Sequence, residues 1–533
     1  MSYTGSRKHA AFQPARVPLL PVAPEGQVSK GSSNQFDCLT AITGPPQPAS
    51  KLLNYLMRAA TIPVRLGMSG CGRCVSVTQS KQMLAAVFAG LLAAPWLTGN
   101  PVEDLRVDAD HPRILLTQRR LRLLKREKER DSMRWQQFSA LVTGGVRLPE
   151  PGFSQALYFQ VAGDEEKGRS AVAWALSEEA KDLRQLALVF DWCQPVLKPE
   201  ERSALVAKIR AALERPAPAD SLPALRDAAL AAIALSGHVE RIPEQRLDEI
   251  INRWWFSEAA PALESGRLRF PRPDFYALYE ALHALRDNLN VDLRESAKSY
   301  FKDVPAYHLL SHSPAPFDAG ENEFRVPALS AGGEPDLTQA ALSRAAELAM
   351  VAFDTNALES QFLQGWLIRD RFMMRGPFGA PYEFLWANPY QPGLSVYHMP
   401  LYLHDPKGGR LLVRSSWEDD ARWLSIESGR IWLYESGKLK TVDPAQAGAL
   451  DFGDVLILFP AHQRGVTISA GEHREKTVFW AGLQPFAKYR IRAAAAEPRL
   501  VAADAAGIVV TPVPPRSEQT LALALAPAEE EQP

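Results

Sequence analysis

The chain has 533 residues, of which 46% are hydrophobic and 23% are charged, so its composition is that of an ordinary globular protein with a large core. This length is enough for roughly two to four domains. The formal net charge of −1 lacks the basic excess of a nucleic-acid binder, so we predict no nucleic-acid partner. A basic cleft for an anionic sugar remains compatible with a neutral chain.

The N-terminal hundred residues differ from the rest. Residues 1–67 are rich in Pro, Gly, Ser and Ala without sustained periodicity, and we predict a disordered or mis-called extension with the true start at Met68 or Met83. Residues 83–97 read MLAAVFAGLLAAPWL, which is shorter than the roughly twenty residues of a membrane helix but suits the core of a signal peptide. We therefore assign 68–100 to a signal peptide, or alternatively a membrane anchor, and expect export to the periplasm, cell envelope or exterior.

The four cysteines give little sign of metal chemistry. Cys71 and Cys74 form a lone C-x-x-C, far from Cys38, with no second pair and no nearby His, which disfavours zinc. Cys193 lies in an apolar run and is predicted to be a small buried hydrophobe. We predict no metal site and no cofactor.

Helical patterns follow one another from about residue 110. Thr117 is predicted to cap one helix, and Pro199 with Glu200 and Glu201 is predicted to open another. Short Pro/Gly joints separate these segments, and no fixed repeat period is present. We predict an α-solenoid or, preferably, a closed (α/α) toroid over residues 108–390.

The hydrophobic period changes towards two from about residue 396. Aromatic and branched residues alternate with polar ones, and Gly408-Gly409 and Ser436-Gly437 are typical hairpin joints. We predict an antiparallel β-sandwich over 391–526, packed against the helices, and a disordered tail over 527–533. The predicted fold class is multidomain α+β.

Four motifs carry a family resemblance. They are HPRILLT at 111–117, LALVFDW at 186–192, FYALY at 275–279 with NVDL at 290–293, and RLLVRSSW at 410–417. In this order and spacing the chain resembles heparinase II/III-like and alginate-lyase-like proteins over roughly residues 110–480. The resemblance implies an α/α toroid with a β-sandwich, and cleavage of uronate polysaccharides by β-elimination.

This reaction needs a group that neutralises the uronate carboxylate and a Tyr or His that moves protons. Tyr276 falls where the family's catalytic Tyr is expected, and Tyr279 and His283 share its helical face. We predict Tyr276 and His283 as catalytic, and Arg272 and Tyr279 as substrate-binding. The alternative is that these aromatic residues belong to the core, as residues at this spacing commonly do.

Two other parts of the family pattern are absent. The Asn or His expected near residues 220–223 is missing, and residues 430–435 replace a His-rich strand. His238, in a Gly-His pair at the end of a predicted helix, is interpreted as a helix C-cap.

Further substrate-binding candidates lie outside the aromatic helix. Glu321 and Glu323 occur in a Pro/Gly-rich loop, where paired acids can serve glycoside hydrolysis, bind a cation or only cap the next helix. Arg371 either faces an anionic sugar or belongs to a solvated face. Trp386 either stacks on a sugar ring or packs the junction of the two domains.

Three functions follow from these observations. The first is an envelope polysaccharide lyase, the second a non-catalytic glycan-binding or scaffold protein on the same fold, and the third a glycoside hydrolase. The predicted partner is a polysaccharide, preferably anionic. The sequence does not indicate an oligomeric state.

Overall fold

The structure is a computed structural model that describes residues 102–107, 110–215, 221–318, 323–324, 336–370, 373–459, 466–472, 474–493 and 497–525. The predictions for 1–67, 68–100 and 527–533, including Cys38, Cys71 and Cys74, lie outside the described residues. Every helix within the described ranges is too short or too polar to cross a membrane. Cys193 is buried, as predicted.

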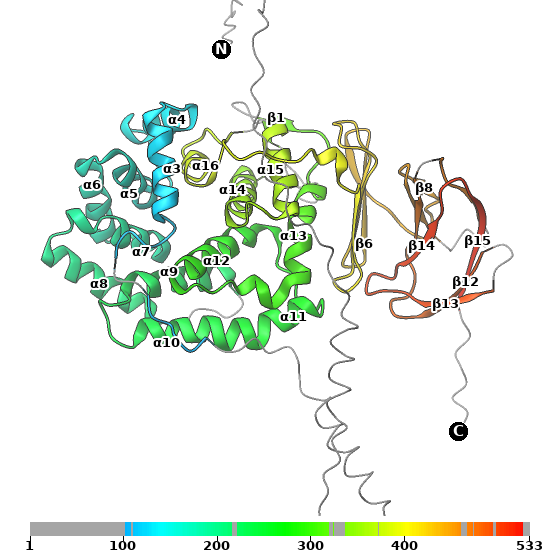
Figure 1. Ribbon diagram of the computed structural model, residues 1–533, viewed down its shortest axis with the longest axis horizontal. Coiled ribbons are helices and arrows are strands. Elements are labelled where there is room, and N and C mark those ends of the chain that lie inside the picture. The colour runs from blue at the N-terminus through cyan, green and yellow to red at the C-terminus, as the bar shows by residue number, and fades with distance from the viewer. Residues whose placement is uncertain are drawn as a thin grey trace, which may run out of the picture. The chain divides into compact units, whose positions relative to one another are not determined.

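The first part of the described chain is helical (Figure 1). Its α-helices are α3 (Gln118–Glu129), α4 (Met133–Thr143), α5 (Pro151–Ala162), α6 (Glu165–Leu176), α7 (Leu183–Trp192), α8 (Pro199–Leu213), α9 (Leu222–Leu235), α10 (Ile242–Asp248), α11 (Ala260–Glu264), α12 (Phe275–Leu289), α13 (Lys298–Leu310), α14 (Leu337–Phe353), α15 (Leu358–Asp370) and α16 (Gly379–Trp386). A π-helical segment, η2 (Glu249–Ala259), joins α10 to α11. Two short strands, β1 (Phe317–Asp318) and β2 (Glu323–Phe324), pair between α13 and α14.

Local capping explains where several helices begin. The Thr117 side chain accepts a hydrogen bond from the backbone N–H of Arg120, which confirms the predicted cap of α3. Pro199 is the first residue of α8, and the Glu201 carboxylate accepts a hydrogen bond from the backbone of Lys198. The Asn290 backbone adopts left-handed geometry after α12, which an asparagine tolerates.

The helices contact one another in a circuit. From α5 the contacts lead to α7, α9, α12, α14, α16 and α4, and α4 contacts α5 again. These contacts confirm a helical domain in the predicted region. The more specific α/α toroid stays a prediction.

The second part of the described chain consists of strands. They are β3 (Tyr402–Asp405), β4 (Arg410–Arg414), β5 (Trp423–Glu427), β6 (Arg430–Glu435), β7 (Lys438–Thr441), β8 (Leu450–Asp451), β9 (Val455–Leu458), β10 (Val466–Ser469), β11 (Lys476–Trp480), β12 (Lys488–Ala493), β13 (Arg499–Ala502), β14 (Val509–Val513) and β15 (Glu518–Leu525). They form three sheets with the strand orders β3-β4-β5-β6-β7, β14-β11-β9-β8 and β10-β15-β12-β13. The described pairings are antiparallel except between β9 and β11, which run parallel, so the sheets are not purely antiparallel as predicted.

The sheets pack in layers, because alternate side chains of a strand point to opposite faces of its sheet. In β4, Leu411 and Val413 join a core with Ile457 and Phe479 of the second sheet. The opposite face of the second sheet, including Leu456, Leu458, Val478 and Trp480, packs against the third sheet. Because the second sheet is buried on both faces, three sheets are stacked where we expected the two layers of a sandwich.

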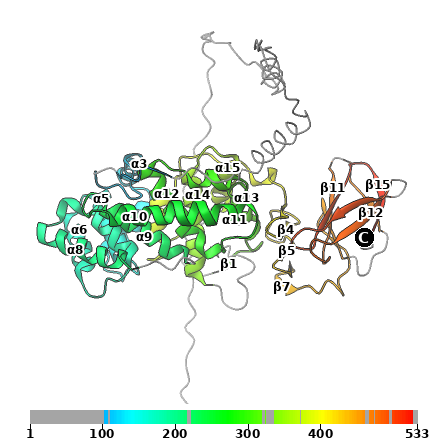
Figure 2. The same cartoon turned by 90° about the horizontal axis from the view of Figure 1, so that it is seen from below.

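The first sheet also packs against the helices, as predicted. Figure 2 shows the helices and strands from a second direction. Leu412 and Trp423 belong to the core of the helical domain. The Trp423 indole donates a hydrogen bond to the Leu310 carbonyl at the end of α13 (2.6 Å), and the Arg269 guanidinium forms a bidentate ion pair with Asp405 (2.7 and 2.9 Å). A helical domain is therefore joined tightly to a C-terminal sheet region.

Candidate functional site

Tyr276, one of the two residues predicted to be catalytic, lies in the first turn of α12 and is buried. Its hydroxyl donates a hydrogen bond to the Glu280 carboxylate (2.8 Å) and accepts one from the Trp386 indole (3.2 Å). Burial and the Glu280 charge raise the pKa of Tyr276 well above its usual value. The described arrangement therefore keeps Tyr276 protonated and engaged with protein groups.

A buried ion network surrounds Glu280 in the helical domain. The Arg184 guanidinium of α7 meets the Glu280 carboxylate bidentately (2.7 and 2.8 Å), and Arg226 of α9 also donates to it. Burial by itself would raise the pKa of Glu280, but the two guanidinium groups outweigh it and lower the pKa. We call Glu280, Arg184, Arg226 and Tyr276 the interior network.

His283 and Tyr279 are also enclosed in the protein. The His283 ring packs on Trp386 (4.5 Å between centroids), and its Nε2 donates to the Ala349 carbonyl (2.9 Å). Burial and nearby Arg120 lower the pKa of His283 well below its usual value, so the ring is neutral at pH 7. Tyr279 is buried with its ring edge-on to Phe353, and burial raises its pKa.

Arg272 belongs to a second buried cluster, near the first sheet. Its guanidinium contacts Glu347 (2.8 Å) and His312 (3.0 Å) and donates to the Ser343 hydroxyl (2.6 Å). Burial lowers the pKa of Arg272. In the described arrangement its hydrogen bonds go to protein groups.

The remaining predicted residues divide into two groups. Glu321 and Arg371 lie outside the described residues. Glu323 is described only through its backbone, which pairs with Asp318 between β1 and β2. Trp386, at the end of α16, lines an open pocket.

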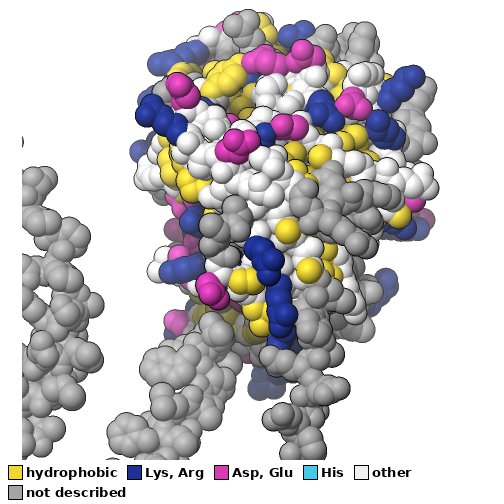
Figure 3. Space-filling model, turned by 90° about the vertical axis from the view of Figure 1, so that its right-hand side faces the viewer, with side chains coloured by type: hydrophobic (Ala, Val, Ile, Leu, Met, Phe, Trp, Pro, Cys, Tyr) yellow, Lys and Arg dark blue, Asp and Glu magenta, His cyan; other side chains and the backbone are white. Residues whose placement is uncertain are grey.

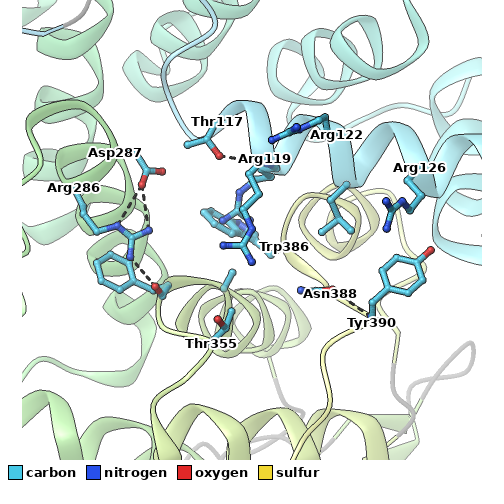
Figure 4. A pocket seen from close by; sticks show the side chains of 14 residues that line it. Thr117, Arg119, Arg122, Arg126, Arg286, Asp287, Thr355, Trp386, Asn388 and Tyr390 are labelled. Carbon is cyan, nitrogen blue, oxygen red and sulfur yellow. Dashed lines mark hydrogen bonds and ion pairs between the residues drawn. The ribbon is translucent and has the colours of Figure 1, made fainter. Parts of the chain in front are cut away.

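This pocket lies between α3, the ends of α12 and α14, and the segment after α16 (Figure 4). Its volume is about 670 Å³, within the usual range for ligand sites. Its described lining includes one acid, Asp287, and five arginines: Arg119, Arg120, Arg122, Arg126 and Arg286. We call it the arginine pocket.

Helix α3 supplies most of this charge. Arg119, Arg122 and Arg126 follow at spacings of three and four, so they share one face of the helix, and all three side chains are exposed. Among the described residues, no carboxylate lies within ion-pair distance of these three guanidinium groups. Asp287, in contrast, is paired with Arg286 (3.2 Å). The pocket therefore holds a cationic surface that other parts of the described protein do not neutralise.

Aromatic rings complete the walls. The Arg120 guanidinium lies 4.1 Å from the centre of the Trp386 ring, and burial lowers its pKa to about 10, so it is still charged at neutral pH. Phe353 lies 3.7 Å from the Arg286 guanidinium. Tyr390 is 44% exposed and donates a hydrogen bond from its hydroxyl to Glu127 (2.5 Å). Trp386 and Phe353 are buried beneath these two guanidinium groups, so Tyr390 is the ring of this set that is exposed in the pocket.

The pocket differs from the face shown in Figure 3, where acidic and basic side chains are interspersed. The sequence analysis named Trp386 as a substrate-binding candidate, which stays a prediction, and missed the arginine pocket. The signal was present in QRRLRLLKR at 118–126, where three arginines occupy one helical face. The spacing of these arginines in the sequence shows that they share a helical face, but it does not show that no acidic side chain of the described residues lies close to them.

Comparison with known proteins adds little. No family model and no curated protein matches the chain. One solved structure, described as a glycoside hydrolase, is 11% identical with a TM-score of 0.28, covering 76% of this chain and 75% of its own. Another, a GH127 β-arabinofuranosidase, is 10% identical with a TM-score of 0.27, covering 78% and 79%. Similarity at this level assigns neither a family nor an activity.

Proposed function

We propose that the protein binds an acidic polysaccharide in the arginine pocket. The observation that carries the proposal is the row formed by Arg119, Arg122 and Arg126, three exposed cations without a described acidic partner. Guanidinium groups bind carboxylate and sulfate groups bidentately, and the exposed ring of Tyr390 can stack on a sugar ring.

The geometry of α3 favours an extended chain over a small compact anion. From Arg119 to Arg126 the helix rises by about 10 Å, because each residue adds about 1.5 Å. Charged groups on successive units of a polymer can therefore each meet a different guanidinium. The whole protein carries a formal net charge of −1, so attraction of an acidic polymer depends on local basic surfaces such as this one.

Binding without cleavage is the form of the proposal that the pocket supports best. Glycoside hydrolysis commonly uses two carboxylates. Among the described lining residues Asp287 is the one carboxylate, and it is paired with Arg286. β-Elimination by a lyase is our second candidate, because Trp386 lines the pocket and also hydrogen-bonds to Tyr276. For that reaction the Tyr276 hydroxyl has to leave Glu280 and reach the sugar.

Calorimetric titration with a polyuronate, a sulfated glycan and a neutral glucan of similar length tests the binding proposal. We expect the wild type to bind at least one of the two acidic polymers and not the glucan. Replacing Arg119, Arg122 and Arg126 by Glu should weaken binding at least tenfold. A matched variant replaces the exposed Arg490, Arg492 and Arg499 of β12 and β13 by Glu. Equal losses in both variants would refute the pocket as the site.

The lyase candidate has a separate readout. Incubation with the same polyuronate should leave ultraviolet absorbance unchanged if the protein only binds. A rising absorbance from an unsaturated product, abolished in Tyr276→Phe, would establish the lyase instead.

We also propose that the protein is exported, on the basis of the apolar segment 83–97, which lies outside the described residues. N-terminal sequencing of the protein from cell fractions tests this. A mature chain beginning after this segment is expected, and a cytoplasmic chain that retains it would contradict the proposal.

A further inference from the structure

We propose that His111 and His238 together bind a divalent transition-metal ion such as Zn²⁺, Ni²⁺ or Cu²⁺. The Nε2 atoms of the two rings lie 3.2 Å apart. His111 precedes α3 and His238 follows α9, so two segments distant in sequence bring these nitrogens together. This site is separate from the polysaccharide binding proposed above and does not depend on it.

Asp191 fixes which nitrogen of His111 is free to bind a metal. Its carboxylate is fully buried and accepts hydrogen bonds from the backbone N–H groups of Arg113 (3.0 Å) and Ile114 (2.8 Å). The other carboxylate oxygen lies 2.5 Å from Nδ1 of His111. An ionised carboxylate only accepts hydrogen bonds, so Nδ1 carries a proton, and in the neutral ring Nε2 of His111 therefore carries the lone pair. A carboxylate behind a histidine in this way is the usual support of a metal-binding imidazole.

The position of His238 is also held by the surrounding structure. The Arg113 guanidinium donates to the carbonyls of Ala234 (3.0 Å) and Ser236 (2.7 Å) at the end of α9. The Phe190 ring lies edge-on to both histidine rings, at centroid distances of 6.2 Å and 5.0 Å. The backbone N–H of His238 donates to the carbonyl of Leu235, the last residue of α9, as the predicted helix C-cap requires, and its side chain faces His111.

The separation of the two nitrogens suits a shared metal ion. Two imidazole ligands at the usual 2.0–2.1 Å from a tetrahedral ion are about 3.3 Å apart. The 3.2 Å contact between the two Nε2 atoms is a hydrogen bond, and His238 is its donor when His111 is neutral with its proton on Nδ1. When a metal binds, His238 gives up the Nε2 proton and takes up a proton at Nδ1, so the ring stays neutral. Each Nε2 then donates one electron pair to the ion.

The pair is open to solvent on the His238 side. His238 is exposed and borders a hollow of about 1060 Å³ that Arg202 and Arg210 of α8 also line. No group of three or more His, Cys, Asp and Glu residues suited to a metal occurs in the described part of the chain. Water or an anion must therefore complete the coordination, and the two arginines favour an anion there. The site should prefer Cu²⁺ over Ni²⁺ and Zn²⁺, following the general order of affinities.

Calorimetric titration of the full, untagged chain with CuCl₂ and ZnCl₂ tests the proposal. We expect one strong equivalent in the wild type and at least a hundredfold weaker binding in His238→Ala, and because His238 is exposed we expect this variant to fold. His398→Ala removes another exposed histidine and should leave the titration unchanged. Unchanged binding in His238→Ala, or absence of a strong equivalent in the wild type, would overturn the proposal.

Paramagnetic resonance of the copper-loaded protein gives a second measurement. The spectrum should show splitting from two imidazole nitrogens in the wild type and from one in His238→Ala. Asp191→Asn tests the positioning role of the carboxylate and should weaken binding about ten- to hundredfold with both nitrogens still present. A wild-type spectrum without two nitrogens would also overturn the proposal.

Discussion

The arginine pocket and the interior network both contain arginines, but the pocket has exposed ones and the network holds its arginines against a buried carboxylate. In the interior, Arg184 and Arg226 are held by the buried Glu280 carboxylate. In the pocket, Arg122 and Arg126 are exposed and have no described carboxylate within reach. Trp386 borders both regions, since it lines the pocket and hydrogen-bonds to Tyr276.

The difference shows where charge is available for a ligand. A buried guanidinium must be paired, because an uncompensated charge costs several kcal/mol inside a protein. An exposed guanidinium is hydrated and needs no partner, so its charge remains free to meet an anion. Function is therefore expected at the exposed arginines, and stability at the buried ones.

The largest expected effect comes from the interior network. Glu280→Gln leaves Arg184 and Arg226 without their shared carboxylate and should lower the free energy of unfolding by about 3–5 kcal/mol. Urea denaturation measures this loss. The control Glu214→Gln breaks the exposed pair with Arg210 and should cost less than about 1 kcal/mol. Equal losses would remove the distinction between the two regions.

A pH dependence follows from the buried histidines. Burial and the neighbouring Arg272 lower the pKa of His308 to about 3, and His283 is shifted in the same direction. The unfolded chain therefore binds more protons than the folded one between the unfolded histidine pKa and pH 3. The contribution of these neutral histidines to the free energy of unfolding is therefore fully present above about pH 6.5 and decreases as the pH is lowered.

We expect the free energy of unfolding to drop by a few kcal/mol between pH 7.5 and pH 5, because each unit of pKa displacement corresponds to about 1.4 kcal/mol. Denaturation at both pH values measures the drop, and His308→Gln should make it smaller. A stability that is constant over this range would show that these rings are not buried in neutral form.

A substitution in the arginine pocket should change the affinity for a polysaccharide and leave the free energy of unfolding nearly unchanged. Arg122→Glu reverses one exposed charge and is expected to weaken binding of an acidic polysaccharide about tenfold, while unfolding changes by less than about 0.5 kcal/mol. Titration at low and at 0.5 M salt should show a stronger salt dependence in the wild type, since ions screen exposed charges. A large loss of stability would mean that Arg122 has a structural role.

The smallest effect concerns the residue shared by the two regions. Trp386→Phe keeps an aromatic ring in the pocket but removes the indole donor to Tyr276, which should cost about 1 kcal/mol of stability. Measuring Trp386→Phe, Glu280→Gln and the double variant gives the coupling between them. Additive effects would show that pocket and interior are energetically independent.

The sequence predicted the order of the two parts of the chain because periodicity is local. The last α-helix ends at Trp386 and the first strand of the stacked sheets begins at Tyr402, close to the expected change near 391–396. The parallel pairing of β9 and β11 was not predicted, since β10 separates them in the chain and no local pattern specifies which strands become neighbours.

The predicted site residues whose side chains the structure describes are all buried. Trp386 also borders a pocket, and Tyr276, His283, Tyr279 and Arg272 are enclosed by other parts of the protein. Their catalytic or binding roles stay predictions. The aromatic pattern at 275–279 has the same appearance whether a tyrosine faces a cleft or a buried carboxylate, so the pattern does not distinguish these situations.

By itself, the sequence determined the helix starts at Thr117 and Pro199, the change from helices to strands and the burial of Cys193, since these depend on nearby residues or on hydrophobicity. Tertiary structure decided which charges are free. Arg184 is neutralised by a glutamate 96 residues away, and Arg122 has no described acidic partner, because the free energy of a charge depends on burial and on neighbours that folding brings together.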